Sequence, residues 1–356
     1  MTGAPRIILV MAGGTGGHIF PALAVADELR ERGWKIVWLG SKAGMESRLV
    51  PQHGFEIEWI RFSGLRGKGL VRMALLPVNL LIAFWQSAHA IFRIRPDVVL
   101  GMGGYISFPG GMMAALLSRP LVLHEQNSVA GLANKVLARV ADCVLVAFPT
   151  ALRNAEWTGN PVRRDIAQLP PPEQRFRIRT GNLKVLVVGG SLGAQVLNEV
   201  VPRALALMPE PLRPEVTHQA GEKHLAALED EYQAAGVKAK SVAFIRNMSG
   251  AYDTADLVIC RAGALTVAEL AAAGVASVLV PFPSAVDDHQ TFNARYLTDR
   301  SAAVLLPQID LTPRKLADLL LEFTREKLLE MAKRARALGK PDAAQVVAEH
   351  CIAIAT

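Results

Sequence analysis

The chain has 356 residues, of which 51% are hydrophobic, and it carries a formal net charge of +7 at pH 7. This leaves ample length for two domains with proper hydrophobic cores, and the positive charge suggests an anionic partner. The three cysteines, Cys143, Cys260 and Cys351, are odd in number and too far apart for a metal knuckle. A disulfide framework is therefore not expected, and a reducing compartment such as the cytosol is expected.

The first predicted element is a strand over residues 7–11, an apolar run too short for a secretory signal. It leads into the glycine-rich loop Gly13-Gly14-Thr15-Gly16-Gly17-His18 and then into a helical pattern that ends near residue 32. Such a loop leaves backbone N–H groups unpaired at a helix N-terminus, where the helix dipole favours an anion or a sugar oxygen. A phosphorylated ligand is therefore expected here.

A dinucleotide-binding domain has a similar loop, but it also needs an acidic residue at the end of its second strand. Here the second predicted strand, over residues 36–39, ends in Gly40-Ser41. A nicotinamide or flavin enzyme is therefore disfavoured.

The uncharged run 73–92 is long enough to cross a membrane. Basic residues flank it on both sides: Arg66, Lys68 and Arg72 before it, and Arg93 and Arg95 after it. Polar residues interrupt it, and a short connection joins it to a strand of the first predicted sheet, so a membrane span is not expected. Two alternatives remain, a helix that covers the core or one whose outer face dips into a membrane interface. The candidates for that outer face are Leu80, Leu81, Phe84 and Trp85.

Three more strands are predicted in the first half, over residues 98–100, 121–123 and 143–147. Uninterrupted aliphatic runs of this kind suit a parallel sheet that is covered on both faces. Four polar residues, His124-Glu125-Gln126-Asn127, follow the second of these strands directly. Because open α/β sheets bind ligands at the carboxyl ends of their strands, this segment is a candidate binding loop, with a capped turn as the alternative.

The charged, proline-rich stretch 160–181 is predicted to be the linker and the entry to a second domain. The pattern then restarts with a strand over 185–188 and a second glycine loop, Gly189-Gly190-Ser191-Leu192-Gly193-Ala194. Further strands are predicted near residue 216 and over residues 242–245, 257–260, 277–280 and 303–306. Two strand-loop-helix units of the same kind predict two similar α/β domains facing one cleft.

Two segments of the second half are hard to explain by packing alone. Residues 261–269, Arg-Ala-Gly-Ala-Leu-Thr-Val-Ala-Glu, predict a strand-to-helix turn with Glu269 on the exposed first turns of the helix. There Glu269 either binds a ligand or complements the helix dipole. Residues 287–293, Asp-Asp-His-Gln-Thr-Phe-Asn, place three different hydrogen-bonding side chains at helical spacing, which a solvated helix start explains about as well as a site.

Taken in order along the chain, these segments resemble those of one known family. The series comprises Gly-Gly-Thr-Gly-Gly-His at 13–18, Met-Gly-Gly-Tyr at 102–105, His-Glu-Gln-Asn at 124–127, Gly-Asn-Pro-Val-Arg at 159–163, Gly-Gly-Ser-Leu-Gly-Ala at 189–194, the segment 261–269, and Asp-His-Gln-Thr-Phe-Asn-Ala at 288–294. It is similar to the MurG family of bacterial transferases. These move N-acetylglucosamine from UDP-N-acetylglucosamine onto undecaprenyl-pyrophosphoryl-N-acetylmuramyl-pentapeptide during peptidoglycan synthesis.

The resemblance implies the GT-B architecture, in which two Rossmann-like α/β domains face a cleft. Residues 1–160 would form an acceptor and membrane-associating domain, residues 161–340 a donor domain, and the last helix, 341–356, would return to the first domain. The resemblance further implies a peripheral protein at the cytoplasmic face of the inner membrane, with an anionic membrane surface as a partner and with no cofactor, metal or nucleic acid. A UDP-sugar epimerase of the same broad fold is the alternative, because fold does not determine function.

The donor site implied by the resemblance lies mainly on the second domain. Backbone N–H groups at the start of the helix near residue 264 would face the UDP pyrophosphate, and Glu269 would accept hydrogen bonds from both ribose hydroxyls. Arg163 and Ser191 would add phosphate contacts, the Ile245 backbone would contact the uracil edge, and Gln290 would hold sugar hydroxyls. The implied donor set is Arg163, Ser191, Ile245, Ala264, Leu265, Thr266, Val267, Ala268, Glu269 and Gln290.

Transfer with inversion needs a base that takes the proton from the C4 hydroxyl of the acceptor. His18 is the first candidate, because the positive end of the helix dipole favours a neutral ring that can accept a proton. Glu125 is the other candidate, although a carboxylate on a facing loop is a weak base. His18 could instead bind the acceptor pyrophosphate or cap the loop. The remaining acceptor or sugar contacts would be Thr15, Gly16, Gly17 and Asn127.

Overall fold

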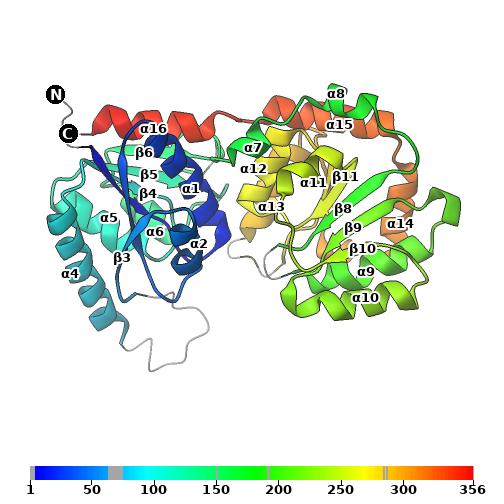
Figure 1. The fold of residues 1–356 in the computed structure, drawn as a ribbon, viewed down its shortest axis with the longest axis horizontal. Coiled ribbons are helices and arrows are strands. Elements are labelled where there is room, and N and C mark those ends of the chain that lie inside the picture. Colours follow the sequence, from blue (N-terminus) through cyan, green and yellow to red (C-terminus); the bar gives the residue numbers. More distant parts are fainter. Residues whose placement is uncertain are drawn as a thin grey trace. The chain divides into compact units, whose positions relative to one another are not determined.

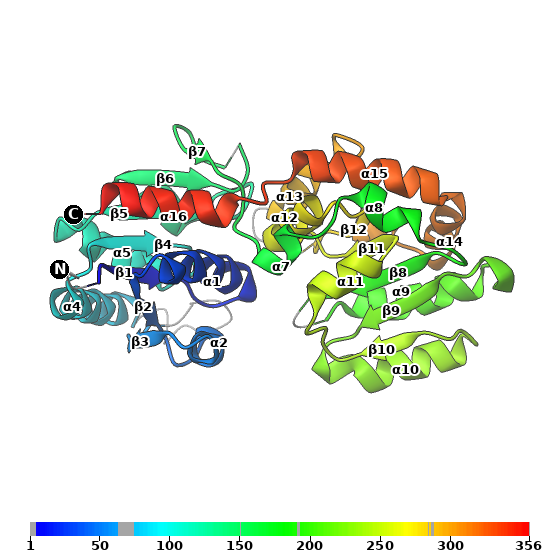
Figure 2. The same cartoon turned by 45° about the horizontal axis from the view of Figure 1, so that its top comes forward.

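The structure is a computed structural model that describes residues 5–62, 75–149, 151–190, 193–283, 285 and 288–355. The chain forms two compact units, one of Met1–Arg163 with Asp342–Thr356 and the other of Arg164–Pro341. Figures 1 and 2 show that each unit is a sheet flanked by helices. Several residues singled out above lie outside the described residues: Ser191, Asp287, Arg66, Lys68, Arg72 and positions 73 and 74.

The first unit contains a seven-stranded parallel sheet of order β3-β2-β1-β4-β5-β6-β7. Its strands are β1 (Ile7–Met11), β2 (Lys35–Gly40), β3 (Glu56–Trp59), β4 (Val98–Gly101), β5 (Leu121–Glu125), β6 (Cys143–Val146) and β7 (Glu156–Trp157). Its described helices are α1 (Gly16–Glu31), α2 (Glu46–Gln52), α4 (Leu76–Ile94), α5 (Ser107–Leu116), α6 (Leu132–Leu137) and α16 (Ala343–Ile354).

Two hydrophobic cores cover the two faces of this sheet. On one face α16 packs beside α1, and Val347 and Cys351 share a core with Ile19 and Leu29 (Figures 1 and 2). On the other face α4 and α5 cover the central strands. Because side chains alternate between the faces of a strand, a strand buried on both sides is aliphatic throughout, as β1 is.

The second unit contains a six-stranded parallel sheet of order β10-β9-β8-β11-β12-β13. Its strands are β8 (Lys184–Val188), β9 (Glu215–Gln219), β10 (Lys240–Val242), β11 (Leu257–Cys260), β12 (Ser277–Leu279) and β13 (Val304–Leu305). Its described helices are α7 (Arg164–Ala167), α8 (Pro172–Arg177), α9 (Gln195–Ala206), α10 (Leu225–Ala234), α11 (Met248–Thr254), α12 (Ala264–Ala273), α13 (His289–Thr298), α14 (Pro313–Glu322) and α15 (Arg325–Leu338), with short 3-10 turns at Glu210–Leu212, Glu222–His224 and Gln308–Asp310.

The stretch 160–181 is packed structure over much of its length. Helices α7 and α8 lie within it, and Phe176 and Arg175 of α8 are buried. The Arg175 guanidinium donates hydrogen bonds to the backbone carbonyls of Tyr252, Ala273 and Gly274. Helices α7 and α8 are therefore packed parts of the second unit, which composition does not reveal, because it does not show that a charged side chain satisfies buried carbonyls.

Two strands, β3 and β7, were not predicted, and β10 ends at Val242 although a strand was expected over 242–245. All three are edge strands. Their residues are largely polar or exposed, as in β7, which consists of Glu156 and Trp157. Edge strands are covered less than central ones, so they lack the aliphatic run from which strands were predicted.

Candidate functional site

The strand order reverses at corresponding places in the two sheets. Strand β1 lies between β2 and β4, and β8 lies between β9 and β11. Open parallel sheets bind ligands outside the carboxyl ends of their strands at such a switch point. One glycine loop follows β1 and the other follows β8, so each unit has a glycine loop at its switch point.

The first glycine loop is held by a buried carboxylate and by close backbone packing. Glu46 is fully buried and accepts hydrogen bonds from the backbone N–H groups of Gly14 and Ser41, both at 3.1 Å. Gly104, with φ +83°, lies so close that an added Cβ would be 2.2 Å from the carbonyl oxygen of Gly13. Sequence reasoning missed Glu46, because a single glutamate at the start of a short helix has no distinguishing pattern.

Helix α1 begins at Gly16, and no side chain caps its N-terminus. Its first-turn N–H groups, at Gly16 and Gly17, therefore face the region beyond β1, and the preceding Thr15 is exposed. His18 is half-buried in the same turn, and its Nδ1 lies 2.9 Å from Oε1 of Gln126, which follows β5. The structure thus brings the predicted residues 15–18 and the segment 124–127 together.

Glu125 does not lie on a loop, as the sequence suggested, but is the last residue of β5 and is 2% exposed. Its carboxylate accepts hydrogen bonds from the backbone N–H and side-chain amide of Asn127, the backbone N–H of Gly131 and the side-chain amide of Asn134. The shortest of these, to the Asn127 N–H and to Asn134, measure 2.8 Å. The Glu125 carboxylate therefore builds the turn that follows β5.

In the second unit, α12 begins directly after β11 and has no side-chain cap. The predicted residues Ala264, Leu265, Thr266, Val267, Ala268 and Glu269 form its first two turns. Its first intrahelical backbone bond runs from the Val267 N–H to the Gly263 carbonyl at 3.0 Å. The N–H groups before Val267 are thus directed out of the helix end, where an anion is favoured.

Glu269 was expected to be exposed, but it is 5% exposed. Its Oε2 accepts a hydrogen bond from the hydroxyl of Tyr252 on α11 at 3.1 Å. Burial, together with the nearby Glu269 charge, raises the pKa of the Cys260 thiol to about 12. The expectation of exposure is wrong because α12 is packed against α7, α11, α13 and α15, so that residues beyond its first turn are covered.

The other predicted donor residues lie in different places. Gln290 on α13 accepts a hydrogen bond from the Phe282 N–H through its Oε1, at 2.9 Å. Its amide nitrogen therefore points away from the Phe282 N–H. Arg163 is the last residue of the first unit, and its guanidinium carbon lies 5.7 Å from the centre of the Phe20 ring. The structure brings Gln290 together with α12, because α13 packs on that helix.

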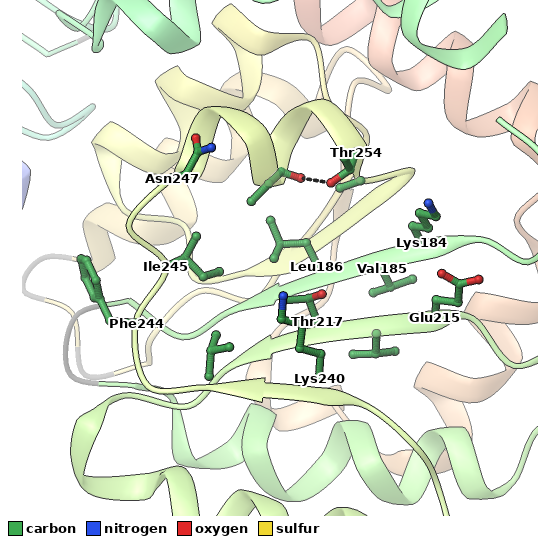
Figure 3. A pocket seen from close by; sticks show the side chains of 14 residues that line it. Lys184, Val185, Leu186, Glu215, Thr217, Lys240, Phe244, Ile245, Asn247 and Thr254 are labelled. Carbon is green, nitrogen blue, oxygen red and sulfur yellow. Dashed lines mark hydrogen bonds between the residues drawn. The ribbon is translucent and has the colours of Figure 1, made fainter. Parts of the chain in front are cut away.

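Ile245 lies beyond the end of β10 and lines a groove of about 610 Å³ on the sheet. Figure 3 shows Ile245, Phe244 and Asn247 at one end of this groove and Lys184 and Glu215 at the other. The groove thus runs along the strands to the carboxyl end of the sheet. Because Ile245 is outside the strand, its backbone is not committed to the sheet ladder.

Helix α4 presents an apolar face to the surface of the first unit. The exposed apolar side chains are Leu75 just before the helix, and Val78, Leu81, Ile82, Trp85 and Phe92 within it. Their spacing of three and four residues places them on one side of the helix. Of the four residues expected on an outer face, Leu81 and Trp85 are exposed. Leu80 and Phe84 are half-buried, and Phe84 lies against Phe108.

Within the described ranges of the chain, no helix is long and apolar enough to cross a membrane.

The chain matches known proteins along both units. The N-terminal domain of glycosyltransferase family 28 matches residues 8–146, and the C-terminal domain of that family matches residues 184–347. A relative from Dechloromonas aromatica, named UDP-N-acetylglucosamine--N-acetylmuramyl-(pentapeptide) pyrophosphoryl-undecaprenol N-acetylglucosamine transferase, is 64% identical over 350 residues, which are 98% of this chain and 99% of the relative.

Solved structures agree with this assignment. The crystal structure of MurG from Acinetobacter baumannii is 41% identical, with a TM-score of 0.85 over 98% of this chain and 100% of that one. A putative UDP-N-acetylglucosamine 2-epimerase from Listeria monocytogenes is 14% identical, with a TM-score of 0.65 over 96% of this chain and 94% of that one, a likeness of fold alone. The resemblance found in the sequence is therefore confirmed: the chain belongs to glycosyltransferase family 28 and, within it, to the MurG family.

Proposed function

We propose that this enzyme transfers N-acetylglucosamine from UDP-N-acetylglucosamine to the C4 hydroxyl of the N-acetylmuramyl group of undecaprenyl-pyrophosphoryl-N-acetylmuramyl-pentapeptide, with inversion at the anomeric carbon. One observation carries the donor assignment: the uncapped N-terminus of α12 is followed within two turns by the buried carboxylate of Glu269. An anion-binding helix end and a hydrogen-bond acceptor thus stand side by side, as a nucleoside diphosphate requires. The named activity of the 64% identical relative supports the choice of sugar and acceptor.

The donor would be held mainly by the second unit. The first-turn N–H groups of α12 would bind the pyrophosphate, and Glu269 would accept hydrogen bonds from the ribose hydroxyls. The Ile245 backbone would contact the uracil, and the amide nitrogen of Gln290 would donate to a sugar hydroxyl. Arg163 and Ser191 are proposed as further phosphate contacts.

The acceptor would be held by the first unit, through Thr15, Gly16, Gly17 and Asn127. We assign the role of base to His18, whose ring is half-buried at the carboxyl edge of the sheet. Among the described residues its ring hydrogen-bonds through Nδ1, to Gln126, and no described residue hydrogen-bonds to its Nε2. Glu125 is a poorer base, because its oxygens already accept hydrogen bonds within the turn after β5.

The proposed step balances in bonds and charge. The C4 oxygen of the acceptor forms a bond to the anomeric carbon, whose bond to the UDP phosphate oxygen breaks. The hydroxyl proton passes to His18 Nε2, and the negative charge that develops on UDP is stabilised by the N-terminus of α12 and by Arg163.

The direct test is incubation with UDP-N-acetylglucosamine and a short-chain lipid I analogue. We expect UDP and a disaccharide product in equal amounts, and both should depend on the acceptor. Release of UDP without acceptor, or formation of UDP-N-acetylmannosamine, would support the epimerase alternative instead.

Variants test the two sites separately. His18→Ala should lower kcat by about 10²- to 10⁴-fold, the usual contribution of a general base, and leave the donor KM nearly unchanged. Glu269→Ala should raise the donor KM by roughly 10- to 150-fold, since hydrogen bonds to a charged acceptor contribute about 1.5–3 kcal/mol. Glu330→Ala, at an exposed ion pair with Lys333, is the control and should change neither constant. An unchanged donor KM in a folded Glu269→Ala variant would overturn the donor assignment.

We further propose that the exposed face of α4 binds the anionic cytoplasmic surface of the inner membrane, where the polyprenyl acceptor resides. The support is its row of exposed apolar side chains beside exposed Arg95. Each basic residue near an anionic leaflet would add about 1 kcal/mol.

Flotation with vesicles of phosphatidylglycerol tests this surface. The double variant Leu81→Gln, Trp85→Gln should lose vesicle binding while keeping activity on a soluble acceptor analogue. Ile309→Gln removes an apolar side chain of the second unit that is 92% exposed, more than Leu81 or Trp85, and should bind as the unchanged protein does. Equal binding by all three proteins would exclude the α4 face.

A further inference from the structure

Four polar groups form a continuous hydrogen-bonded chain that ends at His18. The Nε2 of His124 lies 2.9 Å from the Gly159 carbonyl oxygen, and His124 Nδ1 lies 3.1 Å from the amide nitrogen of Gln126. The Gln126 Oε1 lies 2.9 Å from His18 Nδ1. His124 is fully buried and Gln126 is 1% exposed, so water does not compete for these bonds.

The direction of the first bond is determined by the Gly159 carbonyl, which can only accept. His124 must therefore carry a proton on Nε2. Burial lowers the pKa of His124 to about 4, so its ring is neutral near pH 7 and holds only that one proton. Its Nδ1 is consequently an acceptor.

The orientation of the Gln126 amide follows from two acceptors. Its nitrogen lies 3.1 Å from His124 Nδ1 and also 3.1 Å from the His124 carbonyl oxygen. Neither of these can donate, so the NH₂ group must face both, and Oε1 must face His18. Because Oε1 can only accept, the bond to His18 requires a proton on His18 Nδ1.

We propose that His124 and Gln126 are positioning residues that hold His18 as the tautomer protonated on Nδ1, leaving the lone pair of Nε2 free to take the acceptor proton. A neutral imidazole otherwise exchanges between two tautomers, and the hydrogen bond at one nitrogen decides which is present. The catalytic consequence rests on the proposed role of His18 as the base, whereas the tautomer itself does not.

Gly103, in the loop after β4, packs closely against the contact between His18 and Gln126. With φ +87°, a Cβ on Gly103 would lie 2.7 Å from His18 Nδ1 and 3.0 Å from Gln126 Oε1. The loop after β4 therefore covers the His18 to Gln126 contact with a residue that has no side chain.

The chain of bonds differs from the usual histidine–carboxylate pair in carrying no charge. A carboxylate would also orient the ring, but it would place a second negative charge beside the glycine loop, which the Glu46 carboxylate already contacts at the Gly14 N–H. An amide oriented by a neutral histidine gives the same tautomer without that repulsion. This accounts for a glutamine and a buried histidine in a place where a single carboxylate would suffice for orientation.

The tautomer can be measured without any turnover. In protein labelled with [¹⁵N]histidine, correlation of ring nitrogens with ring protons by NMR identifies the protonated nitrogen, and the His18→Gln variant assigns the His18 signals. At pH 7.5 we expect His18 to carry its proton on Nδ1 and His124 to carry its proton on Nε2. In Gln126→Leu the His18 nitrogens should shift toward the values of a mixed population. A proton on His18 Nε2 in the unchanged protein would overturn the proposal.

Kinetics in two backgrounds separate positioning from general structural support. Gln126→Leu should lower kcat roughly 10- to 100-fold, the usual cost of losing a group that orients a functional side chain, and leave the donor KM unchanged. In a His18→Ala background the same substitution should lower kcat no further, because its effect passes through His18.

An equal loss in both backgrounds would assign Gln126 a structural role and overturn the positioning role. If His18→Ala itself keeps normal turnover, the proposed base is wrong, while the NMR result still decides the tautomer.

Discussion

Replacement of Gly104 by alanine tests whether close packing of the glycine loops sets the acceptor site. An added Cβ would lie 2.2 Å from the Gly13 carbonyl oxygen and 3.0 Å from its carbonyl carbon. These are backbone atoms, so no side chain can rotate away, and the two loops must separate by about 1 Å. A displacement of that size at a reacting group can cost about 10²-fold in rate.

Gly33 provides a matched control in the same unit. Its φ is +82° against +83° for Gly104, but a Cβ added there would meet nothing within 4 Å. In both variants the new alanine must adopt a left-handed backbone conformation, which costs about 1–2 kcal/mol. Only in Gly104→Ala does the added Cβ also overpack its surroundings, which costs about 1–3 kcal/mol more. We therefore expect Gly33→Ala to lose about 1–2 kcal/mol of unfolding free energy and Gly104→Ala about 2–5 kcal/mol.

Urea unfolding followed by circular dichroism gives the stability difference, and steady-state rates with a lipid I analogue give the functional one. Gly104→Ala should lower kcat/KM for the acceptor by about 10²-fold, whereas Gly33→Ala should leave it unchanged. Equal loss of stability in the two variants, with unaltered acceptor kinetics in both, would refute the conclusion that Gly104 sets the position of Gly13.

Three further predictions concern the donor site, acid stability and metal dependence. Tyr252→Phe removes the hydroxyl that donates a hydrogen bond to Glu269 at 3.1 Å. This variant should raise the donor KM several-fold and leave the acceptor KM unchanged. An unaltered donor KM would show that the hydroxyl does not position Glu269. Burial lowers the pKa of His124 to about 4 and that of His218 to about 3, so unfolding takes up protons below about pH 6.5. The free energy of unfolding should therefore fall as the pH decreases from about 6.5 to about 4. The loss should be up to about 1.4 kcal/mol per pH unit for each histidine. A urea midpoint that stays constant over this pH range would contradict this prediction. Turnover should persist in EDTA, because the α12 N-terminus and Arg163 are proposed to carry the phosphate charge; loss of activity that magnesium restores would disprove this.

The central part of each sheet could be predicted from the sequence because the signal is local. The run at 7–11 and the run at 185–188 became β1 and β8, each followed by a glycine loop and a helix. A strand buried on both faces must be apolar at every position, whatever the rest of the chain does. The edge strands β3 and β7 lack that requirement, so nothing local marked them.

The positions of functional side chains were harder to predict. Glu125 and Glu269 both stand out in the sequence as candidate site residues, and the sequence predicts each to be more accessible than it is. A carboxylate in a short motif is usually solvated, and its burial becomes visible only when its partners are known. For Glu269 the partner is Tyr252, 17 residues away on α11.

The sequence by itself determined that this protein has two α/β halves, each with a glycine loop after its first strand, and its ordered motifs identified the family. The tertiary structure alone decided which groups meet at those loops. Gln126 reaches His18 across 108 residues, and Glu46 reaches Gly14 across 32. The strand order β2-β1-β4-β5 brings the carboxyl ends of these parallel strands together, although they are far apart in the sequence. Local patterns are determined by periodicity and backbone preference, whereas these contacts depend on which strands become neighbours, which is a property of the whole packed sheet.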